Sequence, residues 1–125
     1  MPPRKHTYLK THRIAGNTLS IDTASEEAGL REQAAKANTG RAAKTLVKQG
    51  QLRVTLVALR KGSVLSAHRV EGDVTIQVLR GQFEILTQDG AIRAAKGNIV
   101  ALRAGVSHEA HAVRDSTILI TTSMR

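Results

Sequence analysis

The chain has 125 residues and no cysteine, and 19 Lys and Arg against 10 Asp and Glu give it a formal net charge of +9. This length predicts a single domain, and the lack of cysteine excludes disulfides and thiolate chemistry and favours a reducing, cytoplasmic location. No apolar run is long enough to cross a membrane, so we expect no membrane partner.

The excess of basic residues raises the question of a nucleic-acid partner. The positive charges are spread from Arg4 to Arg125, and Tyr8 and Phe83 are the only aromatic residues. Exposed bases would therefore find almost no side chain to stack on, and no recognition helix, zinc finger or RNA-binding signature is visible. We interpret the charge as a solvated basic surface and expect no nucleic-acid partner.

The N-terminal third predicts one helix. Residues 1 to about 16 read as a basic arm, and the alternation at Leu19 and Ile21 is typical of an edge strand. N-cap candidates at 23–25 precede apolar residues at helical spacing, and 38–40 form a stop signal. We therefore expect a helix over 25–37.

From residue 43 onward the pattern changes to short strands separated by turns that contain glycine. The expected strands cover residues 45–47, 54–59, 74–79, 83–87, 91–93, 98–102, 109–113 and 116–122. Many short strands of this kind predict an all-β sandwich or barrel with one N-terminal helix. We place the arm and helix in residues 1–42 and a barrel domain in residues 43–125.

Two blocks that each join a glycine to a histidine carry the most specific signal. In the first block Gly62 lies six positions before His68, and Gly81 closes the block. In the second block Gly97 is followed by Gly105 and then by His108. We expect these glycines to occupy turns that require positive φ.

The spacing of the two blocks resembles the two motifs of the cupin superfamily. The resemblance implies a double-stranded β-helix, the jelly-roll barrel of small single-domain RmlC-like cupins, with metal-binding motifs that are degenerate here. Val70 stands at the position of the second motif histidine, Val74 at the glutamate, Arg103 at the proline and Ala112 at the asparagine.

Strand alternation indicates which of these side chains share a face. Residues two apart lie on the same side of a strand, so His108 goes with Ala110 and Ala112, whereas Glu109 and His111 point the other way. The sequence therefore predicts a ligand pocket lined by His68, Val70, Val74, Ile76, Arg103 and His108.

The same positions bear on metal binding. Catalytic metals usually have three protein ligands, and inward alternation provides two imidazoles, His68 and His108. We therefore expect no cofactor. The alternative is a divalent metal (Fe, Mn, Zn or Ni) held by these two histidines and a third residue outside the motifs. A single histidine on an apolar strand is also commonly a hydrogen-bonded core residue.

Three functions remain open at this stage, and the sequence assigns neither a catalytic residue nor an enzymatic activity. The first is a cupin-fold protein of unassigned activity that binds a small molecule in the barrel. The second is a metal-dependent cupin enzyme of the dioxygenase or isomerase type. The third is a basic regulatory or nucleic-acid-associated protein.

The assembly follows from one apolar strand. The run 54–59 requires cover on both faces, which either the N-terminal helix or a second subunit could provide. Small cupins are commonly dimers, and the resemblance therefore implies a homodimer.

Overall fold

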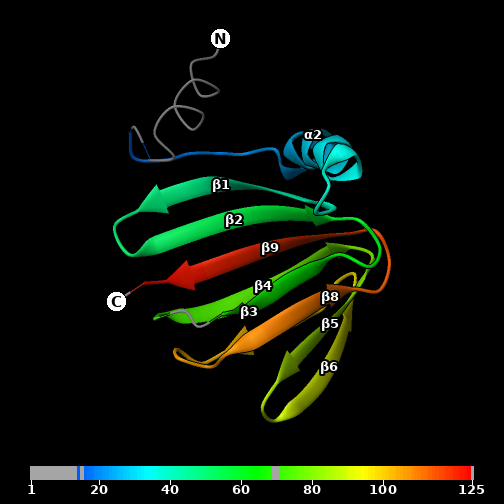
Figure 1. The fold of residues 1–125 in the computed structure, drawn as a ribbon. Coiled ribbons are helices and arrows are strands. Elements are labelled where there is room, and N and C mark those ends of the chain that lie inside the picture. Colours follow the sequence, from blue (N-terminus) through cyan, green and yellow to red (C-terminus); the bar gives the residue numbers. More distant parts are fainter. Residues whose placement is uncertain (1–13, 15, 69–70, 125) are drawn as a thin grey trace.

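The computed structural model describes residues 14, 16–68 and 71–124, with the backbone alone for 66–68. One helix precedes nine strands in this part of the chain (Figure 1). The elements are α2 (Thr23–Lys36), β1 (Arg41–Gln49), β2 (Leu52–Leu59), β3 (Val64–His68), β4 (Asp73–Arg80), β5 (Gln82–Thr87), β6 (Gly90–Ala95), β7 (Ile99–Leu102), β8 (His108–Ala112) and β9 (Ser116–Ser123). None of the helices within the described ranges has the length and apolar character that a membrane span needs.

The strands form two antiparallel sheets. One has the order β1-β2-β9-β4-β7 and the other the order β3-β8-β5-β6. Five of the seven strand pairings join strands that are not consecutive in sequence, as in a jelly roll. The predicted all-β class with an N-terminal helix is confirmed for the described residues. The sheets face each other without joining into a closed hydrogen-bonded barrel, so the predicted barrel is an open sandwich in cross-section (Figure 1).

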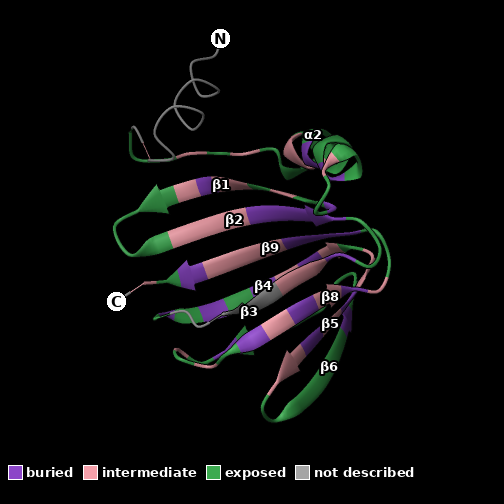
Figure 2. Ribbon diagram, in the orientation of Figure 1, coloured by how far each residue is buried: buried purple, intermediate pink, exposed green. Residues whose placement is uncertain are grey.

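Alternate residues of the strands point into the space between the two sheets. On β4, Val74, Ile76 and Val78 are buried, as their spacing predicts. They pack with Phe83 and Ile85 of the second sheet in one apolar core. Figure 2 shows the resulting alternation of buried and more exposed segments along β4 and β8. Burial of this core is the main stabilising contribution of the sandwich.

Helix α2 begins two residues earlier than the sequence indicates. Its N-cap is Asp22, whose carboxylate accepts hydrogen bonds from the backbone N–H groups of Ala24 and Ser25. An ionised cap accepts more strongly than the hydroxyls that follow it. The edge strand expected at Leu19 and Ile21 is wrong: neither residue pairs with a strand, and Ile21 packs beside the helix.

The helix covers the outer face of the larger sheet over β1 and β2 (Figure 1). Leu30 and Ala34 of α2 are buried against Leu46 of β1 and Leu56 and Ala58 of β2. The opposite face of β2 belongs to the inner core. Residues 56–59 of the apolar run 54–59 are therefore buried on both faces within a single chain, and the run does not by itself require a second subunit.

Glycines stand where the chain turns sharply between strands. Gly62, Gly81, Gly97 and Gly105 all have positive φ, between 84° and 94°, which confirms the expectation. They differ in crowding: a Cβ on Gly81 would lie 2.3 Å from the carbonyl oxygen of Asp115, whereas one on Gly97 would meet no atom within 4 Å. Gly81 thus combines two constraints, and Gly97 has only one.

This difference predicts unequal costs of alanine. Gly97→Ala should lower the free energy of unfolding by about 1–2 kcal/mol, because a left-handed backbone disfavours a Cβ. Gly81→Ala should lower it by roughly 3 kcal/mol or more, since the methyl group also collides with the chain at Asp115 and Ser116. Urea unfolding of the two variants measures both values. Equal losses would contradict the close approach at Gly81.

Thr117 of β9 has a buried hydroxyl group whose hydrogen-bonding capacity is not satisfied among the described residues. The side chain is fully buried, and its Oγ1 finds no hydrogen-bond partner among the described residues. Its neighbour Ile118 points into the inner core, so Thr117 lies on the helix-covered face together with Leu119. A buried hydroxyl without a partner costs stability because it has lost its hydrogen bonds to water.

Replacement of this hydroxyl by a methyl group should stabilise the fold. We expect Thr117→Val to raise the free energy of unfolding by about 1 kcal/mol. The control is Thr121→Val, a half-buried position on the same strand and face, which should change it by less than about 0.5 kcal/mol. A loss of stability in Thr117→Val would mean that the hydroxyl is bonded in solution.

Candidate functional site

The candidate site is built where β3 pairs with β8. Val64 lies opposite His111, Leu65 opposite Ala110 and His68 opposite His108, with an irregularity in the register between Leu65 and His68. The backbone N–H of Gly62 donates to the carbonyl of Ala112 at 2.8 Å and so fixes the far end of the pair. The register thus brings the backbones of the two motif histidines together, although they are 40 positions apart in sequence.

His108 is buried on the inner side of the sandwich. Its side chain is 6% exposed, and it shares the inner face of β8 with Ala110 and Ala112, which belong to the core. The ring Nδ1 lies 3.3 Å from the carbonyl oxygen of Val106. Because a carbonyl only accepts, this contact requires the proton on Nδ1, and in the neutral ring Nε2 then carries the lone pair.

His111 lies on the opposite face of the same strand, as alternation predicts. Its Nε2 is 2.6 Å from a carboxylate oxygen of Glu109, and both side chains are about one-third exposed. The two form an outward-facing pair on the smaller sheet. His111 is therefore separated from the inner face by the sheet itself and cannot join His108 in one ligand set.

The remaining pocket residues divide into core and surface. Val74 and Ile76 are 4% and 2% exposed and pack in the inner core. Arg103 is exposed and lies in a depression of about 540 Å³ that Val74 also lines, between β4 and β7 at the edge of the larger sheet. Val70 lies outside the described residues, and of His68 only the backbone is described. The composition of the pocket thus stays a prediction.

The side chains at the motif positions do not fit a three-ligand metal centre. Val74 and Ala112 hold the places of a glutamate and an asparagine, and neither can coordinate a metal. The described part of the chain contains no group of three His, Cys, Asp or Glu side chains suited to a metal. We therefore derive no chemical step through a metal ion.

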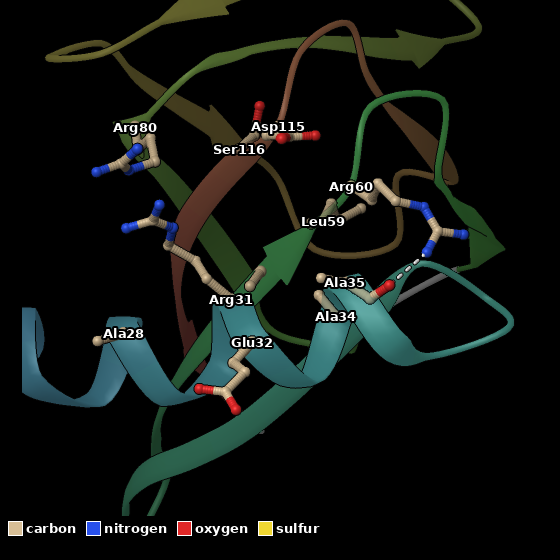
Figure 3. A pocket seen from close by; sticks show the side chains of 11 residues that line it. Ala28, Arg31, Glu32, Ala34, Ala35, Leu59, Arg60, Arg80, Asp115 and Ser116 are labelled. Carbon is tan, nitrogen blue, oxygen red and sulfur yellow. Dashed lines mark hydrogen bonds between the residues drawn. The ribbon is translucent and has the colours of Figure 1, made fainter.

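The sequence did not predict a second cavity. It has a volume of about 410 Å³ and lies between α2 and the ends of β2, β4 and β9, outside the sandwich (Figure 3). Arg31, Arg60 and Arg80 line it together with small apolar residues. Only the docking of the helix onto the sheet brings these arginines together, so no local spacing in the sequence could have revealed the cavity.

Comparison with known proteins places this geometry in a fold family. No protein-family model matches the sequence, and no curated protein does. A solved structure of a conserved protein of unknown function from Streptococcus pyogenes is similar with a TM-score of 0.66 and 27% identity, over 71% of this chain and 78% of that one.

Two further structures carry informative names. A cupin superfamily protein from Desulfitobacterium hafniense is similar with a TM-score of 0.66 and 18% identity, over 68% of this chain and 78% of that one. A salicylate 1,2-dioxygenase from Pseudaminobacter salicylatoxidans is similar with a TM-score of 0.68 and 16% identity, over 79% of this chain and 33% of that one. The jelly-roll topology, the motif spacing and these similarities together identify the chain as a small cupin-fold domain.

Proposed function

We propose that this cupin-fold protein binds a small organic acid or a similar ligand in the interior of the sandwich, without a strong requirement for a metal. The observation that carries the proposal is the pairing of the His68 backbone with His108, whose imidazole is buried on the inner face. A buried imidazole beside an apolar lining is suited to a ligand with one hydrogen-bonding group and an apolar body.

The chemistry of the lining favours binding over catalysis. The aliphatic side chains of Val74 and Ile76 offer neither a nucleophile nor a metal ligand. The imidazole of His108 can form a hydrogen bond with an acidic group of the ligand. Such an arrangement selects a ligand by shape and by one polar contact.

The second candidate function is a metal-dependent enzyme of the dioxygenase or isomerase type. It is supported by the similarity to the salicylate 1,2-dioxygenase, which shares the fold at 16% identity. In this case His68 and His108 would be ligands of Fe, Mn, Zn or Ni, and a residue outside the motifs would provide the third. A homodimer and a cytoplasmic location accompany both candidates, the latter supported by the absence of cysteine.

Salicylate is a suitable probe because it joins an acid group to an apolar ring. We expect it to shift backbone NMR signals of β3, β8 and β4 in protein stripped of metal with a chelator. His108→Ala should weaken its binding roughly tenfold or more, because a charge-assisted hydrogen bond is lost. His111→Ala is the matched control: it removes the same side chain from the other face of the same strand and should leave binding unchanged.

Elemental analysis separates the two candidates. A metal content near one ion per chain that falls in His108→Ala, with binding of salicylate only to the metal-loaded protein, would favour the enzyme and overturn the proposal. Unchanged binding of salicylate in His108→Ala would contradict a binding site at His108.

A further inference from the structure

We propose that the cavity beneath helix α2 is a second binding site, which takes the phosphate group of a small phosphate monoester through Arg31 and Arg80. The cavity lies on the outer face of the larger sheet and shares no lining residue with the predicted pocket inside the sandwich. The inference is therefore independent of the proposed function.

The two arginines come from different elements and meet at one side of the cavity. Arg31 lies on α2, one turn after Glu27, so the two residues share a face of the helix. Arg80, at the end of β4, reaches the same face, with its Nε 3.2 Å from a carboxylate oxygen of Glu27. Figure 3 shows the guanidinium groups of Arg31 and Arg80 on the same side of the cavity.

The charge around these two groups is not balanced. Glu27 forms an ion pair with Arg80, whereas Arg31 forms none within the described part of the chain. Glu32, one residue further along the helix, lies 3.4 Å from Lys36 and points away from Arg80 (Figure 3). Of these two guanidinium groups, that of Arg80 is thus paired with a carboxylate and that of Arg31 is not, so an added anion would gain from the charge of Arg31.

The other polar groups of the cavity already have partners. Arg60 donates to the carbonyls of Ala35 and Ala37, where it stabilises the C-terminal end of α2. Asp115 accepts from the backbone N–H of Lys61, and the hydroxyl of Ser116 donates to backbone carbonyls. These groups shape the cavity, whereas Arg31, and Arg80 beside its pair with Glu27, can donate to a ligand.

The ligand class follows from the chemistry of the two sides. A guanidinium presents a planar fork of N–H donors, and a phosphate has enough oxygens to accept from two forks at once. The remaining wall is apolar and includes Ala28, Ala34, Ala35 and Ala58. A small phosphate monoester with a short aliphatic body satisfies both the arginines and the apolar wall.

Titration of the full chain with butyl phosphate, followed by NMR at fixed ionic strength, tests the site. We expect shifts at residues 28–35, 58–60, 80 and 115–116, with weaker binding of inorganic phosphate, which lacks the apolar body. Arg31→Gln should weaken binding of butyl phosphate roughly tenfold or more, because it removes the charge and keeps a polar side chain. Arg93→Gln is the control, since it removes an equal charge from a pair with Glu84 on the other sheet.

A change at Glu27 gives a readout of opposite sign. Glu27→Gln should tighten binding of butyl phosphate roughly two- to fivefold, since Arg80 then no longer shares its charge with a carboxylate. Weakening in Glu27→Gln, equal losses in Arg31→Gln and Arg93→Gln, or shifts confined to β3 and β8 would each overturn the proposal. His108→Ala should leave this binding unchanged, so that failure of one site is distinguishable from failure of the other.

Discussion

The structure depends on one constraint: β2 and β9 must bury both of their faces in two different apolar layers. Val57 of β2 and Ile118 of β9 point into the layer between the sheets, whereas Leu56 and Leu119 point into the layer beneath helix α2. Side chains that alternate along a strand can serve two layers only if the pairing register is fixed, because a slip by one residue would exchange the layers. The helix is therefore a structural part of the fold, because it covers an apolar face of the larger sheet that would otherwise be exposed to water.

The candidate site inherits its geometry from the same alternation. His108 lies on the inner face because Ala110 and Ala112 are core residues of the same strand. Its partner strand β3 is held in register at both ends of the pair, by the backbone bonds at Gly62 and by the pairing of His68 with His108. The apolar residues at the other motif positions leave a lining that suits an organic ligand better than a metal ion.

The two proposed sites lie on opposite sides of the larger sheet and differ in chemistry. The inner site offers a buried imidazole within an apolar lining. The outer cavity offers two arginines beside a wall lined by alanines. The outer cavity also brings three of the basic residues behind the net charge of +9 to one place, whereas the composition alone favours a uniformly solvated basic surface. Charge that is spread along a sequence can still be concentrated in space by the packing of a helix on a sheet.

Local features of the sequence were sufficient for the fold class and for most of the elements. The glycine turns, the alternation on β4 and β8 and the opposite faces of His108 and His111 follow from steric rules and from a period of two residues, which act over a few positions. The same rules failed at Leu19 and Ile21, where apolar alternation occurs without a strand to pair with.

The tertiary structure alone decided three features. They are the pairing of His68 with His108, the cover of β2 by α2 rather than by a second subunit, and the position of Arg31 and Arg80 at one cavity. Each of them joins residues that lie far apart in the sequence. Contacts of this kind are set by the joint packing of the two sheets and the helix, on which local propensity carries no information.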